Sequence, residues 1–287
     1  MAAIINTNLL SLNAQRNASQ SQNSLAMAMQ RLSSGLRVNS SKDDAAGLAI
    51  ASRMEAQVRG MNVAQRNAND GISLAQTADG ALSQVTNNLQ RMRELSVQAR
   101  NATNTSADRD SLDQEFGQLA QEIQRVLGGT AFNGKNILGT DAGAQTFQIG
   151  ANTSSNDSID ITTVNMTTDA TITAVAGSDN TGSGRAVIDN TATPSTIATV
   201  IDSIDTALTT VNSQRSVMGA AQNRFDAVVA NLQVSVENQS AAKSRITDAD
   251  FATETANLSR AQILQQAGTA MIAQANQLPT QVLTLLR

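Results

Sequence analysis

Residues Leu258 to Arg287 read LSRAQILQQAGTAMIAQANQLPTQVLTLLR, and this stretch decides the fold that the sequence predicts. Apolar or small residues recur in it at every third or fourth position, which is the spacing of a coiled-coil seam. No Asp or Glu follows Glu254. A seam on one helix needs a partner, so the stretch predicts an amphipathic helix made for packing. The seam residues are Leu258, Ala261, Leu264, Gly268, Met271, Ala275, Leu278, Val282 and Leu285.

The first forty residues are the predicted partner of that helix, because apolar residues repeat there at the same spacing and no acid precedes Asp43. One apolar stripe on each helix buries too little area to offset the entropy of ordering the chain. We therefore expect both ends to be largely disordered in the free monomer and to fold when copies meet. The residues expected at contacts between copies are Leu25, Met29, Leu32, Leu36, Leu258, Leu264, Met271, Leu278, Val282 and Leu285.

The composition removes most catalytic chemistry. The 287 residues include no Cys, His, Trp or Tyr, and aromatic residues make up 2%. Disulfides, Ser-His-Asp and Cys-His catalysis and His-ligated metals are therefore excluded. A net charge of -4, with basic residues dispersed and without aromatic neighbours, disfavours a nucleic-acid surface. The sequence predicts a protein that is not an enzyme and that has no cofactor.

A few residues still allow chemistry, and a structural role is favoured for each. Ser41 and Lys42 could form a nucleophile pair, but they are expected in a solvated loop before a helix. The segment Gly182–Arg185 lacks the Lys-Ser/Thr of a phosphate loop. Four acids in two pairs could bind a cation, but no fuller oxygen-ligand loop surrounds them, so helix capping is favoured. These acids are Asp43, Asp44, Asp248 and Asp250.

Targeting and membrane segments are not expected. No apolar run approaches the length of a transmembrane helix, and residues Met1 to Ile5 lack the basic region of a cleavable signal peptide. Arg16, Arg31 and Arg37, among many Ser residues and no acids, resemble a mitochondrial transit peptide in composition. Targeting would explain only one of the two acid-free ends, so this alternative is disfavoured.

Long helices are predicted on both sides of the middle. Helical periodicity runs from Met54 to Ala99, about 70 Å of helix, after a start capped by Asp43 or Asp44. A turn at 101–106 leads to a helix capped by Ser106 or Asp108 and ended by two glycines at 128 and 129. A further helical seam begins at about Ser195. In the first of these helices, Gly60, Gly71 and Gly80 indicate close helix contacts or local bends.

The middle of the chain changes period. Asn133-Gly134, between Phe132 and Lys135, predicts a β-hairpin. Alternating apolar residues around Phe147 and Ile159 predict short strands. The segment 141–194 is rich in Thr, Ser, Asn, Asp and Gly, and its weak alternation at residues 172–175 is interpreted as a further strand between exposed loops.

The predicted fold is mainly α: an elongated coiled-coil-like helical bundle formed by both chain ends, with a small β-rich central region. Periodicity this long favours coiled-coil packing over a compact fold. The predicted regions are 1–42 and 245–287, the two parts of an inner terminal-helix domain; 43–140 and 195–244, the two parts of a helical rod domain; and 141–194, a small exposed region of strands and loops.

At several places the sequence resembles bacterial flagellin, over about the first 150 and the last 90 residues. Each motif alone is weak, but the combination is highly specific. The matching motifs are Ile5–Asn8, Arg31–Arg37, Lys42–Gly47, Arg66–Gly71, Leu89–Leu95, Phe132–Gly134, Ser259–Thr269 and Leu285–Arg287.

The resemblance implies a subunit of the extracellular flagellar filament, exported unfolded through the flagellar type III pathway and used for swimming. It implies that the terminal helices line an inner tube, the rods form an outer tube and the middle faces solvent. It also implies an export chaperone on the C-terminal helix, contacts with flagellar cap and junction proteins, and recognition by a Toll-like innate receptor. The positions matching that receptor site are Leu89, Arg91, Leu95 and Glu115.

Two alternatives stay open. A hook–filament junction protein shares the terminal helices, although the full Arg31–Arg37 and Ser259–Thr269 matches favour flagellin itself. A soluble coiled-coil adaptor could show the same seams without needing two acid-free ends, and deletion of Leu278–Arg287 would then leave its rod intact. The departure from many flagellins is the middle, only about fifty residues here, whose Ser and Thr permit O-glycosylation.

Overall fold

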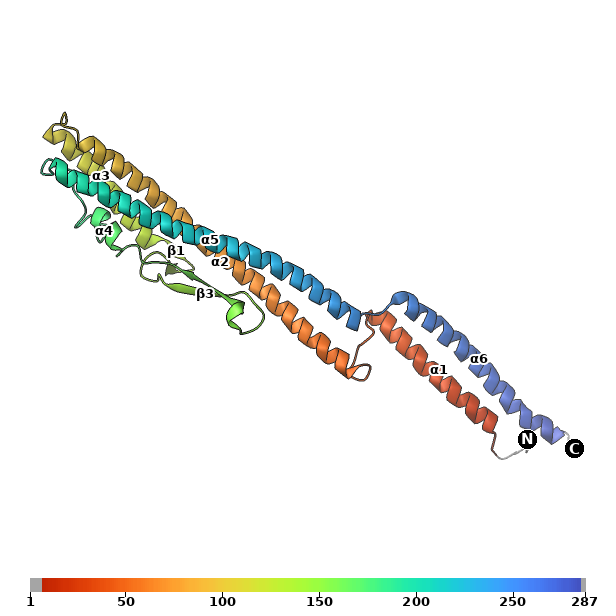
Figure 1. The fold of residues 1–287 in the computed structure, drawn as a ribbon. Helices are drawn as coiled ribbons and strands as arrows, with labels where there is room; N and C mark the ends of the chain where they lie inside the picture. The colour runs from red at the N-terminus through yellow and green to blue at the C-terminus, as the bar shows by residue number, and fades with distance from the viewer. Residues whose placement is uncertain (1–6, 285–287) are drawn as a thin grey trace. The chain divides into compact units, whose positions relative to one another are not determined.

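The computed structural model describes residues 7–284, and it describes side chains as far as Gln277. It divides into a terminal unit (residues 1–56 and 237–287) and a central unit (57–236). The described chain is mainly helical with two small antiparallel sheets, so the predicted mainly α fold with a small β-rich central region is confirmed (Figure 1). The helices are α1 (Leu9–Ser34), α2 (Ala45–Ala99), α3 (Ser106–Gly129), α4 (Ala170–Ala176), α5 (Pro194–Thr247) and α6 (Phe251–Thr284), and the strands are β1 (Ala131–Phe132), β2 (Lys135–Asn136), β3 (Ala144–Gln148) and β4 (Ser158–Thr162).

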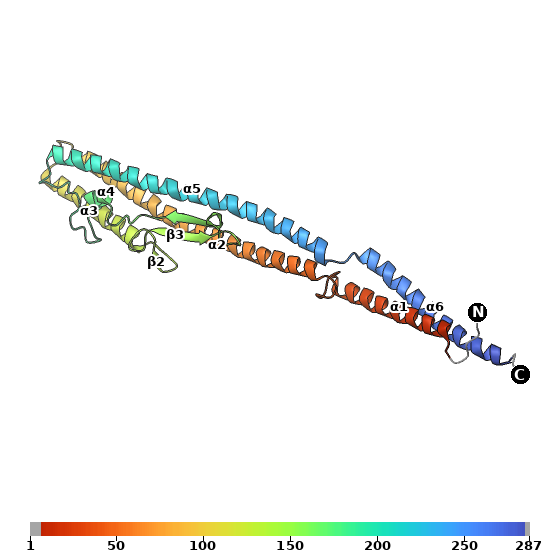
Figure 2. The same cartoon turned by 60° about the horizontal axis from the view of Figure 1, so that its bottom comes forward.

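In the terminal unit, α1 and α6 lie side by side and run antiparallel (Figures 1 and 2). The side chain of Asn8 caps α1 by accepting a hydrogen bond from the Ser11 N–H at 3.2 Å. Gly35, with φ 71°, ends the helix in the left-handed conformation that glycine adopts without steric cost. Just beyond it, Leu36 forms a β-bridge with Asp248, which ties the end of α1 to the start of α6.

Helix α2 begins at Ala45, directly after Asp44, so the start predicted at Asp43 or Asp44 is confirmed. The Asp44 carboxylate accepts the Gly47 N–H at 2.8 Å. Two glycines of α2, Gly60 and Gly71, mark close contacts, as expected. A Cβ on Gly60 would lie 2.9 Å from the Ala151 Cβ, and a Cβ on Gly71 would lie 2.7 Å from the Phe225 ring.

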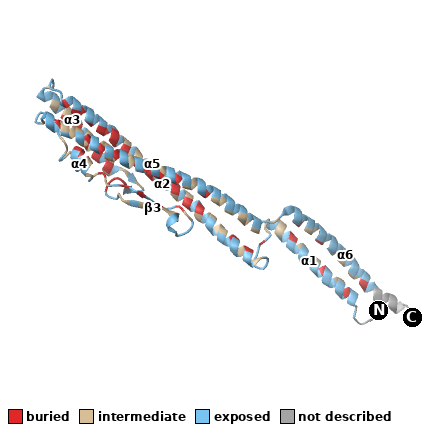
Figure 3. Ribbon diagram, viewed as in Figure 1, coloured by how far each residue is buried: buried red, intermediate tan, exposed pale blue. Residues whose placement is uncertain are grey.

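The central unit has one main hydrophobic core between α2, α3 and α5 (Figure 3). Large side chains such as Leu82, Phe116 and Phe225 are fully buried there. The start of α3 corrects the predicted cap, because Thr105, not Ser106 or Asp108, is the N-cap residue. Asp108 completes a capping box in which each residue's side chain bonds the other's backbone N–H, so the pattern lies one residue earlier than expected.

The predicted hairpin and the predicted short strands are both confirmed. Asn133 and Gly134 both have positive φ, 49° and 79°, and join β1 to β2 in the turn geometry that this dipeptide favours. Strand β3 pairs antiparallel with β4, with Phe147 opposite Ile159. Phe147 also meets the Phe225 ring edge to face, with centroids 5.6 Å apart, so this sheet packs on α5.

The strand expected at residues 172–175 is wrong: this segment is the helix α4. Asp169 caps it by accepting the Thr171 N–H at 2.9 Å. Burial of Ile172, Val175 and Ala176 follows helical spacing, toward one side of a single short helix. Four residues of weak alternation did not contain enough turns of either periodicity to distinguish the two structures.

The loop after α4 is tied to α3 by a buried ion pair. Two guanidinium nitrogens of Arg185 donate to the two carboxylate oxygens of Asp113, at 2.9 and 2.5 Å. The same carboxylate accepts the Ile188 N–H at 2.9 Å. Arg185 also lies over the ring of Phe116, 5.9 Å from its centroid. This fixes the central segment against the helical core.

Candidate functional site

The facing surfaces of α1 and α6 form a heptad seam of mostly small residues. Their closest approach is at Gly268, where a Cβ would lie 3.4 Å from the Cβ of Ala18. Small residues let two backbones approach closely but bury little apolar area. The buried and half-buried seam residues are Ser11, Ala14, Ala18, Ser21, Leu25, Ala28 and Leu32 on α1, and Glu254, Leu258, Ala261, Gln265, Gly268, Ile272 and Ala275 on α6.

The residues that the sequence predicted at contacts between copies fall into two groups, one half-buried in this seam and one exposed. Leu25, Leu32 and Leu258 are half-buried in the contact within one chain, and Leu36 is half-buried just after α1. By contrast, the larger residues on other faces remain open to solvent: Met29, Leu264 and Met271 are 56%, 50% and 62% exposed. Of the remaining expected residues, the side chains of Leu278 and Val282, and all of Leu285, lie outside the described residues.

Large apolar side chains accumulate on the outward faces of the pair. Such residues carry an energetic penalty in water that contact with another surface removes. Beside them, a mostly apolar groove of about 390 Å³ runs between the helices, lined in part by Leu10, Leu264 and Met271. Sequence periodicity identifies only Met29, Leu264 and Met271 among these residues, since the others do not continue the same 3–4 repeat. The exposed set is Leu9, Leu10, Leu12, Met27, Met29, Phe251, Ile263, Leu264 and Met271.

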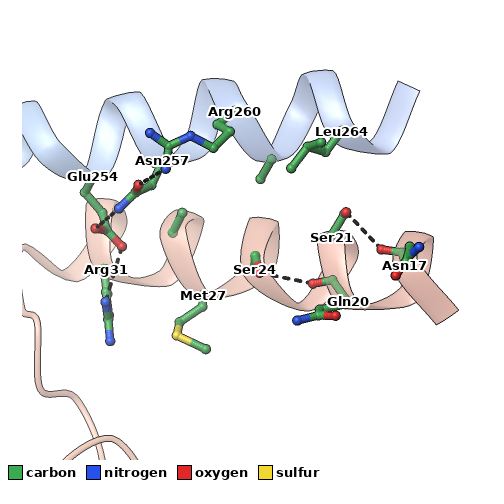
Figure 4. Close-up of a pocket in the computed structure, with 12 residues that line it drawn as sticks. Asn17, Gln20, Ser21, Ser24, Met27, Arg31, Glu254, Asn257, Arg260 and Leu264 are labelled. Carbon is green, nitrogen blue, oxygen red and sulfur yellow. Dashed lines mark hydrogen bonds and ion pairs between the residues drawn. The ribbon is translucent and has the colours of Figure 1, made fainter. Parts of the chain in front are cut away.

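A polar cluster interrupts the seam where the end of α1 meets the start of α6 (Figure 4). Glu254, 8% exposed, lies 3.6 Å from the guanidinium of Arg31. Asn257 donates to Glu254 at 3.2 Å, and Arg260 donates to Asn257 at 3.2 Å. Glu254 is the sole acid in the sequence of either helix. The cluster lines a second groove, of about 590 Å³, between the helices.

The four receptor positions implied by the resemblance differ in solvent exposure. Leu89 and Leu95 are fully buried in the core of the central unit, so their side chains are not available to a partner in this fold. Arg91 is exposed and donates to Glu115 on α3 at 2.8 Å and to Glu94 at 3.0 Å. These hydrogen bonds, the one to Glu115 foremost, raise the pKa of Arg91 above its ordinary value. Of the four positions, only Arg91 and Glu115 face solvent.

The four acids considered for cation binding have structural partners. Hydrogen bonds from the Ser40 backbone and hydroxyl lower the pKa of Asp43, and those from Thr253 and Ala252 lower the pKa of Asp250. Among residues 7–284, no group of three or more His, Cys, Asp or Glu side chains could hold a metal ion. No helix in the described part of the chain is long and apolar enough to cross a membrane.

Large apolar residues exposed on a pair of long terminal helices mark a surface for contact with another protein, as in helical proteins that assemble from copies of one chain. Residues 5–142 match the model of the bacterial flagellin N-terminal helical region, and residues 201–286 match that of the C-terminal helical region. The chain is 46% identical to a flagellin of Halalkalibacterium halodurans over 284 residues, covering 99% of this chain and 100% of that protein. This chain belongs to the bacterial flagellin family.

Two further comparisons also match proteins that are named flagellin. A flagellin of Xenorhabdus nematophila is 44% identical over 319 residues, covering all of both chains. The crystal structure of Bacillus cereus flagellin is 34% identical, covers 62% of this chain and 94% of that one, and has a TM-score of 0.48. Membership of this structural family makes the protein a subunit that polymerises into the flagellar filament.

Proposed function

We propose that the protein is exported unfolded through the flagellar type III pathway and assembles outside the cell into a filament used for swimming, without catalytic activity. The lack of Cys supports passage as an unfolded chain, since no disulfide can form on the way. The lack of His and Cys supports the absence of catalysis. We keep the five-region division as part of this proposal, with 1–42 and 245–287 facing the inner tube and 141–194 facing solvent. The relatives reported above are flagellins, so they favour neither a junction protein nor a soluble adaptor.

The observation that carries the proposal is the exposed apolar surface of the terminal helix pair. Met29, Leu264 and Met271 are each at least half exposed on helices that bury mainly small residues against each other. Covering the exposed part of such a side chain yields about 1–2 kcal/mol, so a few of them supply a substantial part of a subunit contact. Leu278, Val282 and Leu285 extend the proposed surface on their sequence alone.

Seeded polymerisation tests this surface. Met271→Gln places an amide on the proposed contact and should raise the critical concentration by about fivefold or more, because about 1 kcal/mol or more of apolar burial is lost at every interface. Met271→Leu is the matched control, since it keeps the apolar volume, and it should polymerise like the natural protein. An unchanged critical concentration for Met271→Gln would remove Met271 from the interface.

The same outward face of α6 is the proposed binding surface for the export chaperone, because an unfolded subunit presents its apolar residues before assembly covers them. Calorimetric titration of an α6 peptide with the chaperone tests this, and Leu264→Gln with Ile263→Gln should weaken binding. Equal affinity of the natural and substituted peptides would place the chaperone elsewhere. Contacts with cap and junction proteins are proposed to use the same terminal helices.

Recognition by a Toll-like innate receptor is proposed through Arg91 and Glu115, with Leu89 and Leu95 holding α2 in place beneath them. In a receptor reporter assay, Arg91→Ala should reduce the response at unchanged thermal stability, because its side chain is exposed. Leu89→Ala should instead lower stability by about 2–5 kcal/mol, as expected for a buried leucine. A full response to Arg91→Ala would contradict this assignment.

A further inference from the structure

The α1–α6 seam looks nearly the same after a shift of one heptad. Ala18 faces Gly268, and Ala261 and Ala275 lie seven residues to either side on the same stripe of α6. A shift of seven residues moves one helix by about 10 Å along the other and still matches small residues with small residues. Apolar packing therefore discriminates weakly between registers. Something else must select the observed one.

The residue placed to select the observed register is Glu254. In the observed register its carboxylate lies 3.6 Å from Arg31, and only 8% of the residue is exposed. Because Ala18 faces Gly268, a one-heptad shift toward the start of α1 would place Glu254 against Leu25 instead. A buried carboxylate without a cation is costly, whereas in the observed register the ion pair with Arg31 adds to the hydrogen bond that Asn257 donates and offsets that cost. Single polar residues at seam positions are an established means of fixing coiled-coil register.

The local electrostatics agree with the observed pairing. Glu254 lies in the first turn of α6 and Arg31 in the last turn of α1, so each charge is also at the helix end whose dipole stabilises it. At the other end of the pair, Asn8 donates to the Ala275 carbonyl at 2.7 Å and Ser11 to the side-chain oxygen of Asn276 at 2.8 Å. Both contacts belong to the same register.

We propose that Glu254, acting through Arg31, is the positioning residue that fixes the register of α1 against α6. The β-bridge between Leu36 and Asp248 lies close by and is the competing cause. Register decides which outward residues of the two helices share a face, for example Leu10 beside Met271 along the apolar groove. This consequence rests on the proposed assembly surface, whereas the register itself concerns a contact within one chain.

The absence of Cys from the sequence permits a direct test by cross-linking in seeded filaments. Ala18→Cys with Gly268→Cys reports the observed register, since the 3.4 Å between their Cβ positions is close to the ~3.8 Å mean of disulfides. Ala18→Cys with Ala261→Cys or with Ala275→Cys reports the two shifted registers. After oxidation and dissociation, a non-reducing gel separates cross-links within a chain from those between chains.

With Glu254 present, the cross-link within one chain should form between positions 18 and 268. Glu254→Leu should raise the shifted cross-links by on the order of fivefold or more. The charge-swapped pair Arg31→Glu with Glu254→Arg should restore the observed register, which a purely steric role of Glu254 would not do. Glu122→Gln, which breaks the exposed Glu122–Arg125 pair on α3, is the matched control and should change nothing.

Unchanged cross-linking in Glu254→Leu filaments would overturn the proposal and leave the register to the β-bridge and to the Asn8 and Ser11 hydrogen bonds. Failure of the charge swap to restore the register would overturn the role of Arg31. If the Leu variant does not assemble, Glu254→Gln, which keeps the shape of the side chain, is measured against the same threshold. A defect of Met271→Gln in polymerisation with a normal 18–268 cross-link concerns the assembly surface alone, so the two proposals fail separately.

Discussion

Replacement of Arg185 by Met should loosen the central segment from α3, because it leaves the carboxylate of Asp113 buried without its cation. Removing one partner of a fully buried ion pair costs about 3–5 kcal/mol. Here the side chains of Arg185 and Asp113 keep 19% and 12% exposure, and the Ile188 N–H still donates to the carboxylate. We therefore expect a loss of about 2–3 kcal/mol.

That loss corresponds to a fall in the thermal midpoint of roughly 4–12 °C for a unit of this size. Circular dichroism of the full chain measures the midpoint, and limited proteolysis reports whether residues 177–190 become cleavable. Replacing both residues, Arg185→Met with Asp113→Leu, removes the unpaired charge and should recover much of the stability. A midpoint within 1 °C of the natural protein for Arg185→Met, with the loop still resistant, would refute the reasoning.

Further predictions concern the helices and the acids. Gly71→Ala should lower stability by about 1–3 kcal/mol, because its Cβ would lie 2.7 Å from the Phe225 ring. Gly80→Ala, where nothing lies within 4 Å, should raise it by up to about 1 kcal/mol, and denaturant titration compares the two; equal effects would contradict the packing at Phe225. Hydrogen bonds from Thr105 lower the pKa of Asp108, and that from Arg93 lowers the pKa of Asp205, below their ordinary 3.8. The stability from these carboxylates is complete above that value and is lost as the pH falls through the lowered pKa. The thermal midpoint should thus be flat from pH 7 to about 5 and fall below about 4, and a midpoint unchanged down to pH 2.5 would contradict this.

The helices and turns were predictable because their signals are local. Asn133-Gly134 specified its hairpin, and Asp44 specified the start of a helix, without information from distant residues. The segment at Ile172 was not predictable, since its helix depends on burial of one side that only the tertiary fold supplies. Local patterns fix local geometry, whereas short ambiguous segments are decided by what they pack against.

The candidate surface was predictable only in part, because the seam predicted on α6 included small residues that make the observed contact, such as Gly268, together with large residues that do not. Ala18 and Gly268 make the close approach, while Leu264 and Met271, which share the same spacing, are left exposed. The resemblance to flagellin assigned Leu89 to a receptor-binding site, but Leu89 is a core residue here. Which face of a helix is buried requires knowledge of its partner.

Gln265 provides one more prediction. Dispersed Gln and Asn at helix contacts would let neighbouring subunits slide between near-equal packings, so Gln265→Leu should alter the filament waveform. The structure places Gln265 half-buried on the seam within one chain. A waveform change in Gln265→Leu filaments would then arise through the α1–α6 pair, and an unchanged waveform would contradict a role for Gln265 in sliding.

The central claim is that α1 and α6 become ordered when copies of the chain assemble. The most direct test is to compare hydrogen exchange of the α1 and α6 amides between the dilute monomer and the seeded filament. The thin seam and the exposed apolar residues predict fast exchange in the monomer and strong protection at residues 9–34 and 251–277 in the filament. Equal protection in the two states, with no polymer formed in the presence of seeds, would contradict the account.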